Sequence, residues 1–348
     1  MQLENYLIKP NITVLDAMKA IDKGAEGIVY VCDDDRHLLG AVTDGDIRRH
    51  IIHMGDLSIP INGIMTKKPI KLPLSRRLEA NNCMERYSIT SVPIVDENNA
   101  VIEIFFLDSS IRSKSALLNS PVAIMAGGKG TRLAPYTQIL PKPLIPIGEK
   151  TIIEHIIDHF MEFGCNKFDI VVNYKRHLIK SYFRDTPLDT ELTFFDEDDF
   201  LGTAGGLRLL AGRYNEPFFM TNCDIIIEDD YTKMMDFHKK NGNIITIVSA
   251  VVNLSLPYGV IETGDDGYVS AIREKPEISN IVNTGFYILD PEFLDMIPPD
   301  TFIHITDVIK TCIDKNRKVG MYPISGDRWM DMGQMDELQI MTQRLENM

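Results

Sequence analysis

The stretch 126–146 has the residue types of a phosphate-binding loop. It reads AGGKGTRLAPYTQILPKPLIP and follows a short apolar run, 122–125, that is typical of a buried strand. Glycines after a strand let backbone N–H groups approach an anion closely, and Lys129, Arg132 and Lys142 add positive charge. The spacing matches neither GxxxxGK[ST] nor GxGxxG. The chemistry that fits these residues is the binding of a polyphosphate.

This stretch resembles the signature of the sugar-1-phosphate nucleotidyltransferases, which is close to GGxGTRLxPxTxxxPKPLxP. The resemblance implies an NTP and a sugar 1-phosphate as substrates, and Mg²⁺ or Mn²⁺ as the cofactor. It also implies that Arg132 and Lys142 are catalytic, because charge neutralisation and positioning are the main tasks in nucleotidyl transfer. The loop residues expected to bind the nucleotide are Ala126, Gly127, Gly128, Gly130 and Thr131.

Two aspartates in separate motifs are candidate metal ligands. Asp224 follows the apolar run 217–220, and an aspartate at the carboxyl end of a strand is well placed to offer Mg²⁺ a hard oxygen ligand. Asp331 lies in 329–333, Trp-Met-Asp-Met-Gly, which resembles the family's WxDxG motif. The resemblance implies that Asp224 and Asp331 hold the cation together.

Four further short motifs resemble family segments near the sugar, the ribose and the base. These are Tyr-Gly-Val at 258–260, Glu-Lys-Pro at 274–276, Asn-Thr-Gly-Phe-Tyr at 283–287, and Leu-Gly-Thr-Ala-Gly at 201–205. The resemblance implies that the first three contact the sugar phosphate and that the last approaches the base and ribose. The corresponding residues are Gly259, Glu274, Lys275 and Asn283 for the sugar phosphate, and Gly202 and Thr203 for the nucleotide.

One acidic residue bears on the choice of base. Guanine presents two adjacent donors, N1–H and the N2 amino group, and a carboxylate that only accepts hydrogen bonds is complementary to them. Glu197 lies five residues before Gly202, inside the acidic run 196–199. This favours GTP as the nucleotide. The alternative is that the run is a solvated loop and that the backbone alone contacts the base.

The elements that must position these residues alternate between strand and helix patterns along 116–348. Apolar runs at 168–173, 218–222 and 244–252 are separated by amphipathic segments, and Thr151 with Glu154 forms a capping-box pattern before a helix that ends near residue 164. Such alternation favours a mostly parallel α/β sheet. With the resemblance, it predicts a Rossmann-like mixed-sheet nucleotidyltransferase domain.

Residues 1–115 contain an internal repeat of roughly 55 to 60 residues. Each copy, about 1–60 and 61–115, has a helix–strand–turn–strand–helix pattern, and the polar segment 109–120 is the expected linker. This half resembles a tandem pair of CBS domains, most clearly at 40–49, GAVTDGDIRR. The fold class expected for the whole chain is therefore α/β, with a tandem CBS pair ahead of the nucleotidyltransferase domain.

The resemblance implies that Thr43 and Asp46 hold the phosphate and ribose of an adenine nucleotide. The second copy has Leu107 and Ser110 at those two positions, so at most one site is expected. The alternative is that Asp44 and Asp46 cap a helix and that the pair serves only in dimerisation. A homo-oligomer is expected in either case.

Composition limits the setting of the protein. The chain has 348 residues, room for two domains, and a net charge of −14, which argues against broad nucleic-acid binding. Its five cysteines are scattered without a CxxC pair, as in a reduced compartment. The N-terminus is polar, and no apolar run approaches the about 18 residues that span a bilayer. We expect a cytoplasmic protein without membrane association.

The domain order, a CBS pair ahead of a compact nucleotidyltransferase domain, is similar to that of the glucosamine-1-phosphate guanylyltransferases of bacterial legionaminic acid biosynthesis. It implies transfer of a guanylyl group from GTP to glucosamine 1-phosphate. The first alternative keeps this chemistry with mannose, heptose or glucose 1-phosphate and GTP, UTP or CTP. The second is a non-catalytic nucleotide sensor, against which Arg132, Lys142, Asp224 and Asp331 argue.

Overall fold

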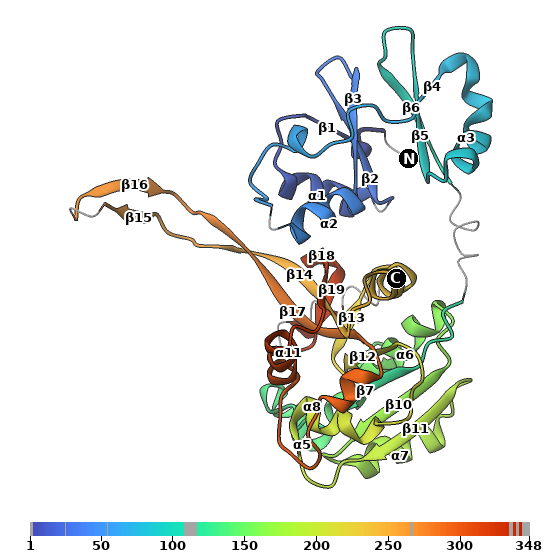
Figure 1. The fold of residues 1–348 in the computed structure, drawn as a ribbon, viewed down its shortest axis with the longest axis vertical. Helices are drawn as coiled ribbons and strands as arrows, with labels where there is room; N and C mark the ends of the chain where they lie inside the picture. The colour runs from blue at the N-terminus through green and yellow to red at the C-terminus, as the bar shows by residue number, and fades with distance from the viewer. Residues whose placement is uncertain are drawn as a thin grey trace. The chain divides into compact units, whose positions relative to one another are not determined.

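The computed structural model describes residues 3–24, 26–53, 55–107, 117–264, 267–333, 337–338 and 341–342. These residues form two compact units, drawn in Figure 1. The first unit lies within 1–115 together with 253–279, and the second lies within 116–252 together with 280–348. Residues 109–116 of the expected linker, which include Ser110, lie outside the described residues, whereas residues 117–120 are described.

The second unit is built on a seven-stranded mixed sheet whose order is β11-β10-β7-β12-β17-β14-β18. Strands β11, β10, β7 and β12 are parallel, β17 is antiparallel to β12, and β14 is parallel to β18. The predicted α/β sheet is therefore present, with β17 as the antiparallel member. The strands are β7 (Val122–Ala126), β10 (Lys167–Val172), β11 (Glu191–Asp196), β12 (Phe218–Asn222), β14 (Ile245–Ser255), β17 (Glu277–Leu289) and β18 (Val319–Ser325).

Helices cover both faces of this sheet. Alternate residues of β7 point to opposite faces, since Val122 and Ile124 belong to one apolar core and Ala123 belongs to another. The first core includes side chains of α6, α7 and α9, and the second includes side chains of α8, α10 and α11. The helices are α5 (Tyr136–Ile139), α6 (Ile152–Glu162), α7 (Arg176–Asp185), α8 (Gly202–Leu207), α9 (Tyr231–Asn241), α10 (Glu292–Asp295) and α11 (Ile305–Asp314).

The start of α6 confirms the capping box predicted from the sequence. The Glu154 carboxylate accepts hydrogen bonds from the Thr151 backbone N–H and hydroxyl, each at 2.7 Å, and from the Tyr182 hydroxyl at 2.8 Å. These bonds satisfy the buried Glu154 and place α6 directly after the proline-rich segment that contains Lys142. Short two-residue and three-residue strands complete the unit: β8 (Pro146–Ile147), β9 (Lys150–Thr151), β13 (Ile225–Ile227) and β19 (Trp329–Asp331).

The first unit contains two three-stranded sheets of one topology. In the order β1-β2-β3 and in the order β4-β5-β6, the first pair is parallel and the second pair is antiparallel. The Tyr30 hydroxyl lies 2.8 Å from the Ser91 hydroxyl, which joins the two sheets through a buried contact. The elements are β1 (Leu7–Ile8), α1 (Val14–Gly24), β2 (Ile28–Cys32), β3 (Leu38–Thr43), α2 (Asp44–Ile52), β4 (Leu72–Pro73), α3 (Ala80–Tyr87), β5 (Ser91–Val95) and β6 (Val101–Phe106).

Strands β15 (Val260–Thr263) and β16 (Val269–Arg273) form an antiparallel hairpin. Its expected turn at 264–267 includes residues 265 and 266, which lie outside the described residues. All five cysteines are buried and unpaired, as the scattered spacing indicated. Within the described ranges, no helix is both long enough and apolar enough to cross a bilayer.

Candidate active site

The predicted phosphate loop leaves the central strand β7 and forms one wall of a cavity of about 270 Å³. Gly130 has φ +63°, and a Cβ at this position would lie 2.9 Å from the Thr137 Cγ2. The Thr137 hydroxyl donates to the Gly130 carbonyl at 2.9 Å, which fixes the turn. A side chain at position 130 would thus meet both backbone strain and a clash, so the glycine of the motif is required by the geometry.

The cavity brings together most of the residues that the sequence singled out. Arg132 is exposed at its edge, while Lys142 is only 8% exposed and lies between two prolines. Lys129 is exposed and is not among the lining residues, although its neighbours Gly128 and Gly130 are, so its contribution to phosphate binding stays a prediction. The lining residues are Met125, Gly127, Gly128, Gly130, Thr131, Arg132, Lys142, Glu197, Phe200, Gly202, Thr203, Asn222, Cys223 and Asp224. Ala126, the last residue of β7, is buried behind this lining.

The two candidate metal ligands are held beside each other by a small sheet. Strands β13 and β19 pair antiparallel, with Ile225 opposite Asp331, and the Met332 N–H donates to the Asp224 carbonyl at 3.0 Å. The Asp224 carboxylate forms an ion pair with the ammonium group of Lys142. Two motifs more than a hundred residues apart in the sequence therefore meet, and Asp224 lines the cavity whereas Asp331 lies beside it, outside the lining.

The environment of Asp331 suits a cation. Its Oδ1 atom is buried and accepts no hydrogen bond from any described residue. Burial raises the pKa of Asp331 to about 6, and repulsion from Asp224 adds to the rise, while Lys142 and Arg132 act in the opposite direction. A divalent ion would relieve both the burial and the repulsion. Because the described residues contain no cluster of three or more metal-ligating side chains, the pair would leave further coordination positions for water or phosphate oxygens.

This environment gives a prediction about stability in the absence of metal. An unfolded Asp331 ionises near its ordinary pKa of 3.8, whereas the folded one ionises near 6, so folding loses stability as the pH rises between these values. We expect Asp331→Asn to melt at a higher temperature than the wild type at pH 7.5 in EDTA, with the difference vanishing near pH 4. Thermal denaturation across this range measures it, and an equal melting temperature at pH 7.5 would contradict it.

Of the acidic run 196–199, Glu197 is the residue that lines the cavity. It is 3% exposed, whereas Asp196, Asp198 and Asp199 of the same run are exposed. Its Oε1 accepts the Leu201 N–H at 2.8 Å, and burial raises the pKa of its carboxyl group. The interpretation of this residue as part of a solvated acidic loop is therefore wrong.

Close packing of backbone against Glu197 explains two of the glycines. A Cβ on Gly127 would lie 2.7 Å from the Glu197 Oε2, and a Cβ on Gly206 would lie 2.9 Å from its Oε1. Any larger residue at either position would displace the carboxylate. The Gly127 of the phosphate loop is therefore also part of the wall around Glu197, which the motif alone does not reveal.

A short segment that sequence reasoning missed holds both walls of the cavity. The Tyr174 N–H donates to the Gly127 carbonyl at 3.3 Å, and the Lys175 ammonium donates to the carbonyls of Gln138 at 2.5 Å and Ile139 at 2.8 Å. The Asn173 amide donates to the Glu197 carbonyl at 2.8 Å. The available signal was a polar Asn-Tyr-Lys directly after the apolar strand β10, since such positions carry function in parallel sheets.

The predicted sugar residues are not gathered in this cavity. Gly259, Glu274 and Lys275 lie on the hairpin segment 253–279, where a Cβ on Gly259 would be 2.9 Å from the Glu274 Oε2 and the Lys275 N–H donates to the Tyr258 carbonyl at 3.2 Å. Asn283 lies on β17, and its amide donates to the Tyr287 hydroxyl at 2.7 Å. The structure thus groups the three hairpin residues with one another, and their role toward a sugar stays a prediction.

In the first unit, Thr43 and Asp46 contact each other at the start of α2. The Asp46 carboxylate accepts the Thr43 backbone N–H at 2.9 Å and the Thr43 hydroxyl at 2.7 Å, and Thr43 Oγ1 accepts the Asp46 N–H at 3.2 Å. This is a capping box. Asp46 therefore takes part in capping, with Thr43 as the N-cap, whereas Asp44 instead pairs with Arg48 at 2.6 Å. A nucleotide role for Thr43 and Asp46 stays a prediction.

Comparison with known proteins bears on both units. Residues 122–347 match the family described as nucleotidyl transferase, and residues 3–53 match the CBS domain. The mannose-1-phosphate guanyltransferase of Pichia angusta is 34% identical over 224 residues, which is 61% of this chain and 60% of that protein. That of Saccharomyces cerevisiae is 33% identical over 222 residues, with the same shares. The chain thus spans about 60% of the length of the curated relatives it matches.

Solved structures support the fold. HddC from Yersinia pseudotuberculosis superposes with a TM-score of 0.52 at 23% identity, over 65% of this chain and 99% of HddC. A putative glucose-1-phosphate thymidylyltransferase from Bacillus anthracis gives 0.52 at 21% identity, over 66% and 96%. Both confirm the mixed α/β fold predicted for the second unit. With the family match over most of that unit, the chain belongs to the nucleotidyl transferase family and has a CBS domain ahead of the family region.

Proposed function

We propose that this protein transfers a guanylyl group from GTP to a sugar 1-phosphate, forming a GDP-sugar and releasing pyrophosphate. The observation that carries the proposal is a single cavity with two separate kinds of group. Arg132, Lys142 and Asp224 suit phosphates and a cation, and the same cavity is lined by the buried carboxylate of Glu197.

Glu197 supports guanine as the base. Its Oε1 already accepts one backbone N–H, and its Oε2 has no hydrogen-bond partner among the described residues, so the carboxylate retains the capacity to accept two more donors. Guanine N1–H and N2–H are adjacent donors that match this capacity, whereas uracil and thymine offer one donor beside acceptors. Because Glu197 is buried, a base that leaves its carboxylate without hydrogen-bond donors would lose binding free energy.

The reaction is an in-line substitution at the α-phosphorus. An oxygen of the sugar phosphate forms a bond to the α-phosphorus of GTP, and the bond from that phosphorus to the β-phosphate oxygen breaks, so pyrophosphate leaves. In this proposal Arg132 stabilises charge on the α-phosphate and the departing pyrophosphate, and Lys142 holds the phosphates. Asp224 and Asp331 would hold a divalent cation, Mg²⁺ or Mn²⁺, which when bound neutralises the phosphate charge.

Two acceptor sugars have separate support. The curated relatives are named mannose-1-phosphate guanyltransferases, which favours mannose 1-phosphate. The CBS domain ahead of the family region favours glucosamine 1-phosphate, by similarity to the enzymes of legionaminic acid biosynthesis. A matrix of pyrophosphate release, with four NTPs against mannose, glucosamine, glucose and heptose 1-phosphates, tests both the base and the sugar. Release with no pair above the background of the Asp224→Asn variant would reject the proposed activity.

Glu197→Gln tests the choice of base. An amide keeps one acceptor but places a donor against the guanine donors, so we expect the ratio of kcat/KM for GTP over UTP to fall about 10- to 150-fold, or roughly 1.5 to 3 kcal/mol. The exposed neighbour Asp199 provides the control variant Asp199→Asn, which should keep the wild-type ratio. Unchanged selectivity in Glu197→Gln would show that Glu197 does not face the base.

We further propose that the first unit binds an adenine nucleotide through Thr43 and Asp46. The site would use groups that already hold the start of α2, so the two roles must be separated by experiment. Asp16 offers a matched control, because its carboxylate accepts the Thr13 hydroxyl at 2.7 Å and its N–H donates to Thr13 Oγ1 at 3.0 Å, at the start of α1.

We expect AMP to bind the full-length protein with one site per chain. Asp46→Ala should abolish binding because the ribose hydroxyls lose their acceptor, whereas Asp16→Ala should lose only the stability of a helix cap, about 1 kcal/mol. Isothermal titration calorimetry with AMP, and thermal denaturation of both variants, measure the two effects. No heat with AMP at millimolar concentration, or equal weakening by both variants, would reject the nucleotide site.

A further inference from the structure

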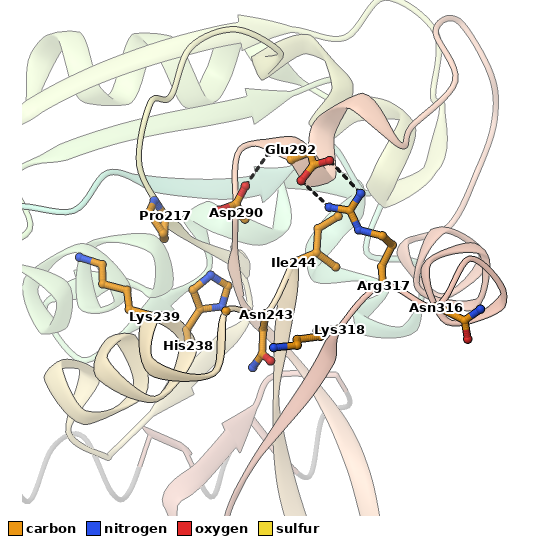
Figure 2. Close-up of a pocket in the computed structure, with 11 residues that line it drawn as sticks. Pro217, His238, Lys239, Asn243, Ile244, Asp290, Glu292, Asn316, Arg317 and Lys318 are labelled. Atoms are coloured by element: carbon orange, nitrogen blue, oxygen red, sulfur yellow. Dashed lines mark hydrogen bonds and ion pairs between the residues drawn. The ribbon is translucent and has the colours of Figure 1, made fainter.

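A second cavity, of about 400 Å³, lies at the opposite end of β12 from the candidate active site. Pro217, which precedes β12, lines it, whereas Asn222 to Asp224 at the other end of the strand line the active-site cavity. Figure 2 shows the residues that surround it, which come from the end of α9, the residues before β14, the segment from the end of β17 to the start of α10, and the segment between α11 and β18. The volume lies in the range of sites for small molecules, about 300 to 1,000 Å³.

His238 is the buried polar group of this cavity. Its side chain lines the space although the residue is 1% exposed. Its Nδ1 lies 2.9 Å from Thr246 Oγ1, which also accepts a hydrogen bond from the Asn243 amide at 2.9 Å. We assign the Thr246 hydroxyl as the donor to Nδ1, which leaves the lone pair on Nδ1 and the hydrogen on Nε2. Nε2–H has no partner among the described residues.

The ring is neutral at ordinary pH. Burial lowers the pKa of His238 to about 4, against a smaller opposing effect of Asp290. His238 therefore offers one fixed, uncharged N–H donor at the base of the cavity. A ligand with an acceptor atom in the cavity would gain this hydrogen bond.

Charged side chains around His238 determine which ligand fits. Arg317 and Glu292 form a bidentate ion pair and largely neutralise each other. The other charged groups are the carboxylate of Asp290 and the ammonium groups of Lys239 and Lys318, which lie on either side of the His238 ring in Figure 2. The Lys318 ammonium donates to the Asn241 carbonyl at 3.2 Å and keeps two further hydrogens for a ligand. The excess of positive charge favours an anion, and the Asp290 Oδ2, which has no partner among the described residues, favours a ligand that also carries a hydroxyl donor.

We propose that this cavity binds a sugar carrying a phosphate monoester, separately from the active site. The phosphate lies between Lys239 and Lys318 and accepts the His238 Nε2–H, and a sugar hydroxyl donates to Asp290. The cavity is larger than an inorganic phosphate requires, and the hydroxyl-bearing part of the ligand occupies the remaining volume. Lys239 and Lys318 are exposed, so they can be replaced without disturbing the core.

Mannose 6-phosphate is the probe, because its free anomeric hydroxyl prevents it from acting as a sugar 1-phosphate acceptor. We expect it to bind the full-length protein with a Kd below about 1 mM, and Lys239→Ala and Lys318→Ala each to weaken binding at least about 10-fold through the loss of a charged hydrogen bond. Lys240→Ala is the matched control, since Lys240 is the next exposed residue of α9 and does not line the cavity. Nitrogen-15 NMR of labelled histidine should show the Nε2–H signal of His238 moving with mannose 6-phosphate.

Three outcomes would overturn the proposal. The first is no binding of mannose 6-phosphate. The second is binding that Arg132→Ala removes and Lys239→Ala and Lys318→Ala leave unchanged, because the ligand then lies in the active site. The third is an affinity for inorganic phosphate, or for mannose, equal to that for mannose 6-phosphate. Either result would show that the cavity does not recognise the phosphate and the sugar together.

Discussion

Asp224→Asn or Asp331→Asn should lower the turnover of guanylyl transfer at least about 100-fold at saturating GTP, sugar 1-phosphate and Mg²⁺. The two carboxylates lie beside each other, and Asp331 has a buried oxygen without a partner among the described residues. Asparagine keeps the size of each side chain but removes one of the two negative charges. The charge that develops on the α-phosphate would then be poorly neutralised.

The measurement should separate metal binding from catalysis. Mn²⁺ binding, followed by electron paramagnetic resonance without substrates, should weaken in both variants, and turnover should be partly restored by excess metal. Asp236→Asn changes an exposed aspartate of α9 and should leave both quantities unchanged. Wild-type rates in Asp224→Asn and Asp331→Asn at limiting Mg²⁺ would remove these residues from the metal site.

Arg132→Ala should lower turnover about 100-fold while changing the Kd for GTP much less. Arg132 is exposed at the edge of the cavity and is not held in an ion pair by any described residue, so its guanidinium is available to follow charge as it moves toward the departing pyrophosphate. A contact that strengthens in the transition state reduces kcat, whereas uniform binding changes only KM.

Lys129→Ala is the control for this effect. Lys129 lies on the same loop and carries the same charge, but it does not line the cavity. It should therefore keep kcat near the wild-type value. If Arg132→Ala raises the KM for GTP and leaves kcat intact, Arg132 contributes only to ground-state binding of the nucleotide.

The sequence best predicted those site residues that lie close together along the chain. Gly130, Arg132 and Lys142 belong to one continuous motif, and Thr151 with Glu154 are three residues apart, so the pattern carries their geometry directly. Asp224 and Asp331 could be paired only through resemblance, because the contact of β13 with β19 is not encoded in either motif. The burial of Glu197 depends on the packing of Gly127 and Gly206, which no spacing rule supplies.

Contacts between distant segments account for what the sequence did not predict. Lys175 donates to backbone carbonyls of α5. Because every residue has a backbone carbonyl, the sequence does not indicate which ones accept these hydrogen bonds. The second cavity assembles His238, Asp290 and Lys318 from segments up to eighty residues apart, and each residue alone has an ordinary surface or core pattern. Such sites become visible only when the strand order places the ends of separate elements together.

The segment Asn173–Lys175 bears on how the protein would discriminate between NTPs with different bases. It donates hydrogen bonds to the Gly127 backbone on the phosphate side and to the Glu197 backbone on the base side. If Glu197 contacts the base and the loop holds the triphosphate, as proposed, this segment would link the free energies of the two contacts, and that linkage would be reciprocal. An NTP with the wrong base would then bind weakly, and its α-phosphate would also be held less firmly in position for the reaction. Discrimination between nucleotides should therefore be shared between the rate of bond formation and the affinity.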